Sequence, residues 1–125
     1  PTLIFDEVDS GVGGAVANTV GKLLRQLGQD RQVLAVTHLP QVASCADHHW
    51  VVSKVRNETD TSSQVKHILS LDREKEIARM LGGDTTTGTS LAHAKEMLDM
   101  QHVTPAKNLK APQSLPVKTK KLKTV

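Results

Sequence analysis

Residues 3–7 read Leu3-Ile4-Phe5-Asp6-Glu7, three apolar side chains followed directly by two carboxylates. An apolar run without alternation predicts a strand that is buried on both faces of a parallel sheet. Such a strand delivers Asp6 and Glu7 to the carboxyl edge of the sheet, where open α/β folds bind their ligands. Adjacent charges are costly to desolvate, so we expect a metal, a basic group or water to meet them. The alternative is that the pair merely opens a solvated loop.

A helix and a second apolar strand follow. Apolar residues recur at helical spacing over residues 15–27, and Gly28 is suited to end that helix. Residues 32–37 then form a strand with a second continuous apolar run. Strand, helix and strand in this order predict a βαβ unit with two parallel strands. The predicted apolar face of the helix comprises Val16, Val20, Leu23, Leu24 and Leu27.

The end of the second predicted strand carries a histidine, His38, directly after Thr37. Because the crossover brings both strand ends to one edge, we expect His38 to lie beside Asp6 and Glu7. Two acids and a histidine at neighbouring strand ends form a candidate catalytic group. A histidine that only hydrogen-bonds within its own loop is the alternative.

After His38 the sequence predicts a short helix that begins near Pro40, since proline suits the first helical turn. Cys45, the single cysteine, is expected to be a small buried residue and not a nucleophile. With His48 and His49 it resembles part of a zinc site, but the set lacks a fourth ligand at the usual spacing. We therefore do not expect zinc there.

A hairpin is predicted next. Residues typical of strands over residues 49–54 and 65–71 indicate an antiparallel pair, joined by a polar loop at residues 57–63. Two helices complete the predicted domain. Asp72 and Ser90 are expected to cap them at their N-termini.

Charge divides the chain in two. Residues 1–100 carry ten Lys and Arg against thirteen Asp and Glu, whereas residues 101–125 carry six lysines and no acid. The second part has no periodic apolar face, so we predict one folded domain over residues 1–100 and a disordered tail over residues 101–125. The tail either binds DNA phosphates or only solubilises the protein. Its lysines are Lys107, Lys110, Lys118, Lys120, Lys121 and Lys123.

Composition excludes several classes. One Phe, one Trp and no Tyr provide too few rings for a base-stacking platform. A single cysteine excludes an internal disulfide framework and fits a reducing cytoplasm. No apolar run reaches transmembrane length and no signal peptide opens the chain, so we expect no membrane contact. A strand that starts directly after Pro1 predicts a segment of a longer protein.

Three motifs resemble the C-terminal part of a P-loop NTPase head of the ABC type, in its SMC-like branch. Leu3–Glu7 looks like the Walker B strand with its catalytic glutamate, and Val36-Thr37-His38 looks like the H-loop. Val8–Gly13 occupies the place of the D-loop. Its glycines match neither a phosphate-binding P-loop nor a dinucleotide fingerprint. The implied α/β fold has parallel βαβ strands, an antiparallel hairpin and two C-terminal helices.

Longer stretches narrow the resemblance to the RecN family of bacterial DNA repair proteins. They are Phe-Asp-Glu-Val-Asp-Ser-Gly-Val-Gly-Gly at residues 5–14 and Val-Thr-His-Leu-Pro-Gln-Val-Ala at residues 36–43. Residues 77–83 and 91–98 are similar to the end of that family. The resemblance implies two heads that sandwich ATP and Mg²⁺, carry coiled-coil arms and act in recombinational repair of double-strand breaks. The resemblance thus implies a second head domain as partner. It also implies a cytoplasmic location at the nucleoid.

The resemblance also implies a role for each matching residue. Asp6 would hold Mg²⁺ through a water, Glu7 would orient or deprotonate the attacking water, and His38 would contact the γ-phosphate. These are the parts that phosphoryl transfer requires, because it depends on positioning and charge stabilisation. Further contacts to the nucleotide would come from Asp9, Ser10 and Gly11.

Two departures from the family pattern matter. Gly13 stands where ABC transporters have the last D-loop aspartate, and the chain has no Walker A, Q-loop, signature motif or coiled coil. We therefore expect that the chain alone neither binds ATP tightly nor hydrolyses it. Two other functions stay open. One is a non-catalytic DNA- or protein-binding module that retains the fold, and the other is a Mg²⁺-dependent hydrolase that uses Asp6, Glu7 and Asp9 alone.

Overall fold

The first two strands pair in parallel and end level with each other. β1 (Thr2–Asp6) and β2 (Gln32–Val36) are joined by α1 (Gly14–Leu27), and their register places Asp6 opposite Val36. This confirms the predicted βαβ unit. The two loops that leave the carboxyl ends of the strands therefore start side by side.

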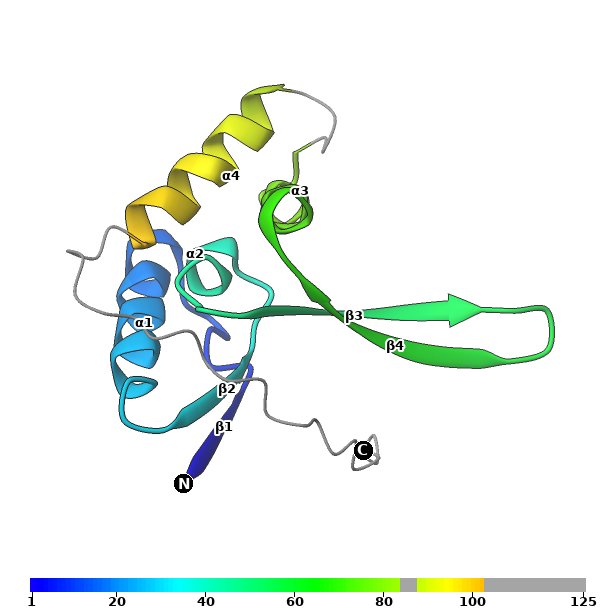
Figure 1. The fold of residues 1–125 in the computed structure, drawn as a ribbon, viewed down its shortest axis with the longest axis horizontal. Helices are drawn as coiled ribbons and strands as arrows, with labels where there is room; N and C mark the ends of the chain where they lie inside the picture. The colour runs from blue at the N-terminus through cyan, green and yellow to red at the C-terminus, as the bar shows by residue number, and fades with distance from the viewer. Residues whose placement is uncertain (84–87, 103–125) are drawn as a thin grey trace.

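The computed structural model describes residues 1–83 and 88–102. Figure 1 shows the parallel pair beside α1, the later helices packed above them, and a hairpin that projects from the body. No helix in these two stretches is long and apolar enough to span a bilayer. The remaining elements, in order, are α2 (Pro40–Ala43), β3 (His49–Arg56), β4 (Thr61–Ile68), α3 (Ser70–Met80) and α4 (Gly88–Gln101).

The prediction that β1 is buried on both faces is wrong. Leu3 and Phe5 are half-buried on one face, whereas Ile4 on the other face is 69% exposed. β2 repeats the asymmetry, because Val33 is half-buried and Leu34 is exposed. Side chains of a strand alternate between two faces, so each face needs its own covering element. α1 packs against β2, and no element among the described residues covers the exposed face.

The most buried residues of α1 are small and lie outside the predicted apolar stripe. Ala17 and Gly21 are buried, whereas the stripe is only partly covered. Val20, Leu24 and Leu27 are half-buried, and Val16 and Leu23 are mostly exposed. A Cβ atom added to Gly21 would lie 2.7 Å from Sγ of Cys45, so a larger residue would push the two segments apart. Cys45 itself is buried, as predicted. Close approach at Gly21 therefore allows α1 to pack tightly against the segment around Cys45.

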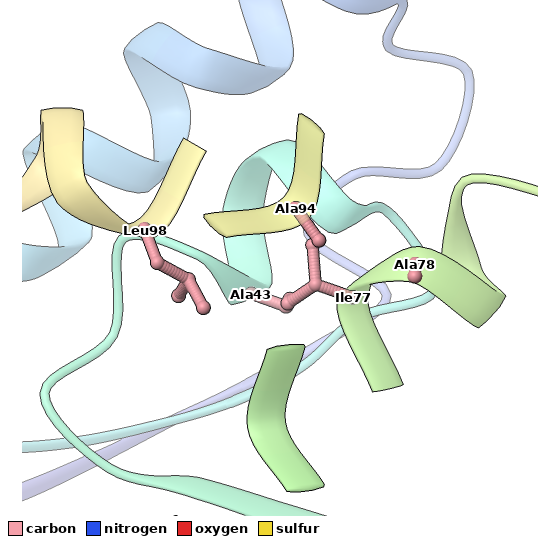
Figure 2. Close-up of a cluster of buried hydrophobic side chains, with 5 residues drawn as sticks. All are labelled: Ala43, Ile77, Ala78, Ala94 and Leu98. Carbon is pink, nitrogen blue, oxygen red and sulfur yellow. The ribbon is translucent and has the colours of Figure 1, made fainter. Parts of the chain in front are cut away.

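The main apolar cluster joins α2, α3 and α4. Figure 2 shows Ile77 of α3 between residues of the other two helices. Ile77 is fully buried, and three of the four other buried members of the cluster are alanines, which let the helices approach closely. The cluster fixes the helix that follows His38. Its buried members are Ala43, Ile77, Ala78, Ala94 and Leu98.

β3 and β4 form the predicted antiparallel hairpin, but β3 extends two residues beyond its predicted end and β4 begins and ends earlier than predicted. The register runs unbroken from His49 opposite Ile68 to Arg56 opposite Thr61. The turn is therefore limited to residues 57–60. Serine and threonine residues predicted as loop are strand residues, because the ladder of backbone hydrogen bonds with β3 outweighs their turn preference.

The predicted helix starts are wrong by a few residues. α3 begins at Ser70 and its N-cap is Leu69, so Asp72 lies in the first turn and does not cap. Ser90 lies inside α4 and not at its start. Asp72 still complements the positive end of the helix dipole, which a carboxylate anywhere in the first turn can do. Residues 84–87, before α4, and most of the predicted tail lie outside the described residues.

Candidate functional site

Asp6 and Glu7 lie at the exposed carboxyl end of β1. Asp6 is the last strand residue, and Glu7 has a φ of 50°, in the left-handed region that L-residues rarely adopt. The amide of Ser10 donates to the carbonyl of Glu7 over 3.0 Å and closes a tight turn. Within the described part of the chain, neither carboxylate forms an ion pair. Both are accessible to a ligand.

Asp9 is buried and joins the two strand ends. Its side chain is 0% exposed, and Oδ2 accepts a hydrogen bond from the Thr37 hydroxyl. The same oxygen accepts a longer bond, of 3.3 Å, from the amide of Leu39. The Thr37 hydroxyl in turn accepts a bond of 3.0 Å from that amide. One carboxylate therefore holds the residues on both sides of His38.

His38 lies next to this buried carboxylate and faces solvent. Its side chain is 74% exposed, and its Nδ1 lies 3.6 Å from Oδ1 of Asp9. That oxygen has no hydrogen-bond partner among the described residues, and a proton on Nδ1 would face it across a distance slightly longer than a hydrogen bond. With Nδ1 toward Asp9, Nε2 of the ring is the outward nitrogen.

The pKa of Asp9 lies below its ordinary value. Burial raises it, but hydrogen bonds from Thr37, from the amide of Asp9 itself and from Leu39 outweigh burial, with help from the charge of His38. The carboxylate is therefore ionised at neutral pH. It can accept from Nδ1–H whether the ring of His38 is neutral or charged.

Arg73 of α3 fixes the segment that follows His38. Its guanidinium donates to the carbonyls of Ala43, the last residue of α2, and of Ala46, just beyond the helix, the first over 3.3 Å. Carbonyls at a helix end lack partners within the helix, so this half-buried cation satisfies them. Burial is the main reason that the pKa of Arg73 is lowered. The segment after β2 is thus held by Asp9 at its start and by Arg73 at its end.

The structure brings the predicted residues Asp6, Glu7 and His38 to adjacent strand ends and adds Thr37, which sequence patterns missed. Thr37 was not assigned a role, although a hydroxyl residue directly before His38 was a usable signal. Ser10 and Gly11 are exposed in the turn after Asp9. Gly11 has a φ of 74°, where glycine avoids the strain that a side chain would cause.

Asp6 is the candidate metal ligand in this region. No group of three His, Cys, Asp or Glu side chains is arranged to hold a metal ion in residues 1–83 and 88–102. An exposed carboxylate at a strand end nevertheless fits Mg²⁺, which is commonly held by one or two carboxylates together with waters and phosphates. Cys45 of the candidate zinc set is buried, and burial raises the pKa of its thiol, which disfavours the thiolate that zinc needs.

Comparison with known folds defines the class of protein. No family model matches the chain. The structure resembles a solved chain from work on the ATP-driven dimerization and DNA-stimulated activation of SMC ATPases, with a TM-score of 0.52. The likeness covers 67% of this chain and 49% of the other at 20% identity. The fold is therefore that of part of an SMC-type ATPase head.

Sequence comparison is more specific. The chain is 52% identical over 101 residues to DNA repair protein RecN of Vibrio cholerae and 49% identical over 102 residues to that of Haemophilus influenzae. It is 46% identical over 99 residues to RecN of Streptomyces coelicolor. These matches cover 78%, 82% and 79% of the chain. The chain therefore belongs to the RecN family, in the SMC-like branch. The chain spans 17–18% of the length of these relatives.

Proposed function

We propose that the chain forms the hydrolytic edge of an SMC-like ATPase head that acts in recombinational DNA repair, as part of a RecN-type protein. The observation that carries this proposal is the level pairing of β1 and β2, which brings Asp6, Glu7 and His38 to one edge. The names of the relatives and the SMC-type fold support the same function. A cytoplasmic location at the nucleoid follows from that role.

Glu7 is the residue nearest the chemistry. Its exposed carboxylate orients the attacking water and takes its proton, a contribution of about 10²–10⁴ in rate. The left-handed φ of 50° at Glu7 ends the extended backbone of the strand at this residue. Strain of this kind persists where the surrounding structure requires it, and here the hydrogen bond from Ser10 holds the turn.

His38 contacts the γ-phosphate and senses its loss. When both ring nitrogens carry a proton, the outward Nε2 can donate to a phosphate oxygen while Nδ1 faces Asp9. Asp9 acts as a positioning residue through this ring, because its own carboxylate is buried. The exposed turn at Ser10 and Gly11 adds contacts to the nucleotide or to the second head.

Asp6 would hold Mg²⁺ through a water. The ion, when bound with ATP, neutralises charge on the phosphates. The chain contains no Gly-Lys-Ser/Thr sequence, so the groups that cradle the phosphates come from elsewhere in the longer protein and from a second head. The lysine tail adds a DNA contact, and truncation after Met100 would then weaken binding and reduce its dependence on salt.

Exchange of segments tests the proposal. The chain replaces the corresponding segment of Vibrio cholerae RecN, and ATP hydrolysis by the chimera is compared with that of the unmodified relative. We expect rates within about tenfold of each other. A folded chimera that binds ATP but does not hydrolyse it would overturn the proposal and favour a non-catalytic module. Turnover by the isolated chain, abolished by Glu7→Gln, would contradict the dependence on other parts of the protein.

A further inference from the structure

We propose that the β3–β4 hairpin is a duplex DNA-binding arm, separate from the hydrolytic edge and from the lysine tail. The hairpin projects from the body, and its two strands make their main contacts with each other (Figure 1). Each strand has eight residues, so the arm extends about 27 Å at 3.4 Å per residue. A two-stranded ribbon of this kind fits the major groove of B-form DNA.

The charge of the two strands is wholly positive. They carry Lys54, Arg56 and Lys66 and no acidic residue, whereas residues 1–100 as a whole have more acids than bases. None of the three cations forms an ion pair in the stretches that the structure describes. Unpaired exposed cations of this kind can neutralise DNA phosphates and so release the counterions that the DNA holds.

One face of the hairpin combines these cations with hydroxyl groups. Alternation along β3 places Lys54 and Arg56 on the same face, about 7 Å apart, and the register sets them opposite Ser63 and Thr61. All four residues are exposed. Cations and hydroxyls are the side chains that contact phosphate and sugar. Lys66 lies on the reverse face of the hairpin. We name the hairpin, with these four residues and Lys66, the basic arm.

An aromatic pair lies at the base of the basic arm. The ring of Trp50 lies 4.7 Å from that of His67 at an angle of 31°, on the same face as Lys54. Trp50 remains 52% exposed. Between the pair and the cations lie Val52 and Val65, also exposed, which suit contact with sugars and thymine methyl groups.

The negative charge of the hairpin turn limits which part of the basic arm can contact DNA. Glu58 and Asp60 place two carboxylates at the tip, which repel phosphates. The arm therefore meets DNA with its face and not with its tip. An acidic protein segment offers charge but no groove for a ribbon, so duplex DNA is the occupant that the shape and charge favour together. The inference goes beyond ATP hydrolysis and would hold for an inactive head.

Two triple variants of the full chain test the inference by fluorescence anisotropy with a labelled short duplex over a range of salt. Lys54→Gln, Arg56→Gln and Lys66→Gln together should weaken binding at least about tenfold and lower the slope of log K against log salt by about two to three.

The matched control removes the same charge from exposed helical positions, with Lys22→Gln, Lys75→Gln and Lys95→Gln. We expect it to change affinity less than about twofold. Equal effects of both triples, or none from either, would overturn the inference.

Trp50 gives a second readout, since it is the single tryptophan. Saturating duplex should quench or shift its fluorescence, also when all six tail lysines are replaced by glutamine. DNA binding that leaves the emission unchanged would assign binding to the tail and overturn the inference. So would an equal response to poly-glutamate, which would indicate an acidic protein partner. A shift that depends on protein concentration without DNA would indicate self-association of the arm and would also contradict it.

Discussion

The Thr37 hydroxyl donates a hydrogen bond to the buried carboxylate of Asp9 and so ties the loop after β2 to the loop after β1. The two residues are 28 positions apart and come from different strand ends. Through the Leu39 amide the same carboxylate holds the far side of His38. The histidine is exposed, but the backbone on both sides of it is fixed.

Removal of the Thr37 hydroxyl should destabilise the fold. Thr37→Val leaves the Asp9 carboxylate buried without its hydroxyl donor, which we expect to cost about 1–3 kcal/mol in free energy of unfolding. Chemical denaturation measures this cost, and Thr37→Ser should retain most of the stability. Thr19→Val is the control, because its exposed hydroxyl bonds only a carbonyl of its own helix, and it should change stability by less than about 0.5 kcal/mol. Equal effects of the two valine variants would contradict the role of the Asp9 bond.

The stabilisation from Asp9 should decrease in acid. The folded pKa of Asp9 is below its ordinary value of about 3.9, so the folded state prefers the ionised carboxylate. This contribution is complete above the ordinary pKa and is lost as pH falls through the folded pKa. The difference in unfolding free energy between the native sequence and Asp9→Asn should therefore be constant above about pH 5 and shrink below about pH 4. A difference that grew on acidification would contradict the network, and Asp30→Asn, at an exposed position, serves as control.

Gly21→Ala should destabilise the contact between α1 and the segment after α2. The new Cβ would lie 2.7 Å from Sγ of Cys45 and 3.1 Å from the carbonyl oxygen of Gln41. Overpacking of this kind costs about 1–3 kcal/mol, which a thermal or denaturant melt would detect. Gly14→Ala in the same helix meets nothing within 4 Å and should be neutral or slightly stabilising. Cys45→Ala should partly restore the stability of Gly21→Ala, and a lack of any rescue would place the cause elsewhere.

Arg73 should matter far more for stability than Arg79 of the same helix. Arg73→Gln removes the donor to the carbonyls of Ala43 and Ala46, and we expect a loss of about 1.5–3 kcal/mol. Arg79 pairs with Glu76 at the surface, where ion pairs contribute about 0–1 kcal/mol. Unfolding curves of Arg73→Gln and Arg79→Gln measure the contrast. Similar losses in both variants would show that the bonds of Arg73 do not fix the end of α2.

Sequence patterns predicted the parallel unit and the meeting of strand ends, because both follow from local periodicity and the handedness of crossovers. They could not predict which acid joins the loops. Asp6, Glu7 and Asp9 look alike in sequence, and only the fold buries Asp9 against a hydroxyl 28 residues away. The same limit applies to α1, where Gly21 packs closely against Cys45 and the apolar stripe is only partly covered. Burial and close approach depend on partners that periodicity does not identify.

The proposed hydrolytic role of the strand ends is tested most directly by the kcat for ATP in the chimera with Vibrio cholerae RecN. We expect Glu7→Gln to lower kcat at least about 100-fold, with nucleotide binding retained, because the variant lacks the proposed general base but keeps the fold. Glu58→Gln, a matched change in the exposed hairpin turn, should leave kcat within about twofold of the chimera. Unchanged kcat in Glu7→Gln, or equal losses in both variants, would contradict the assignment of Glu7 to the chemical step.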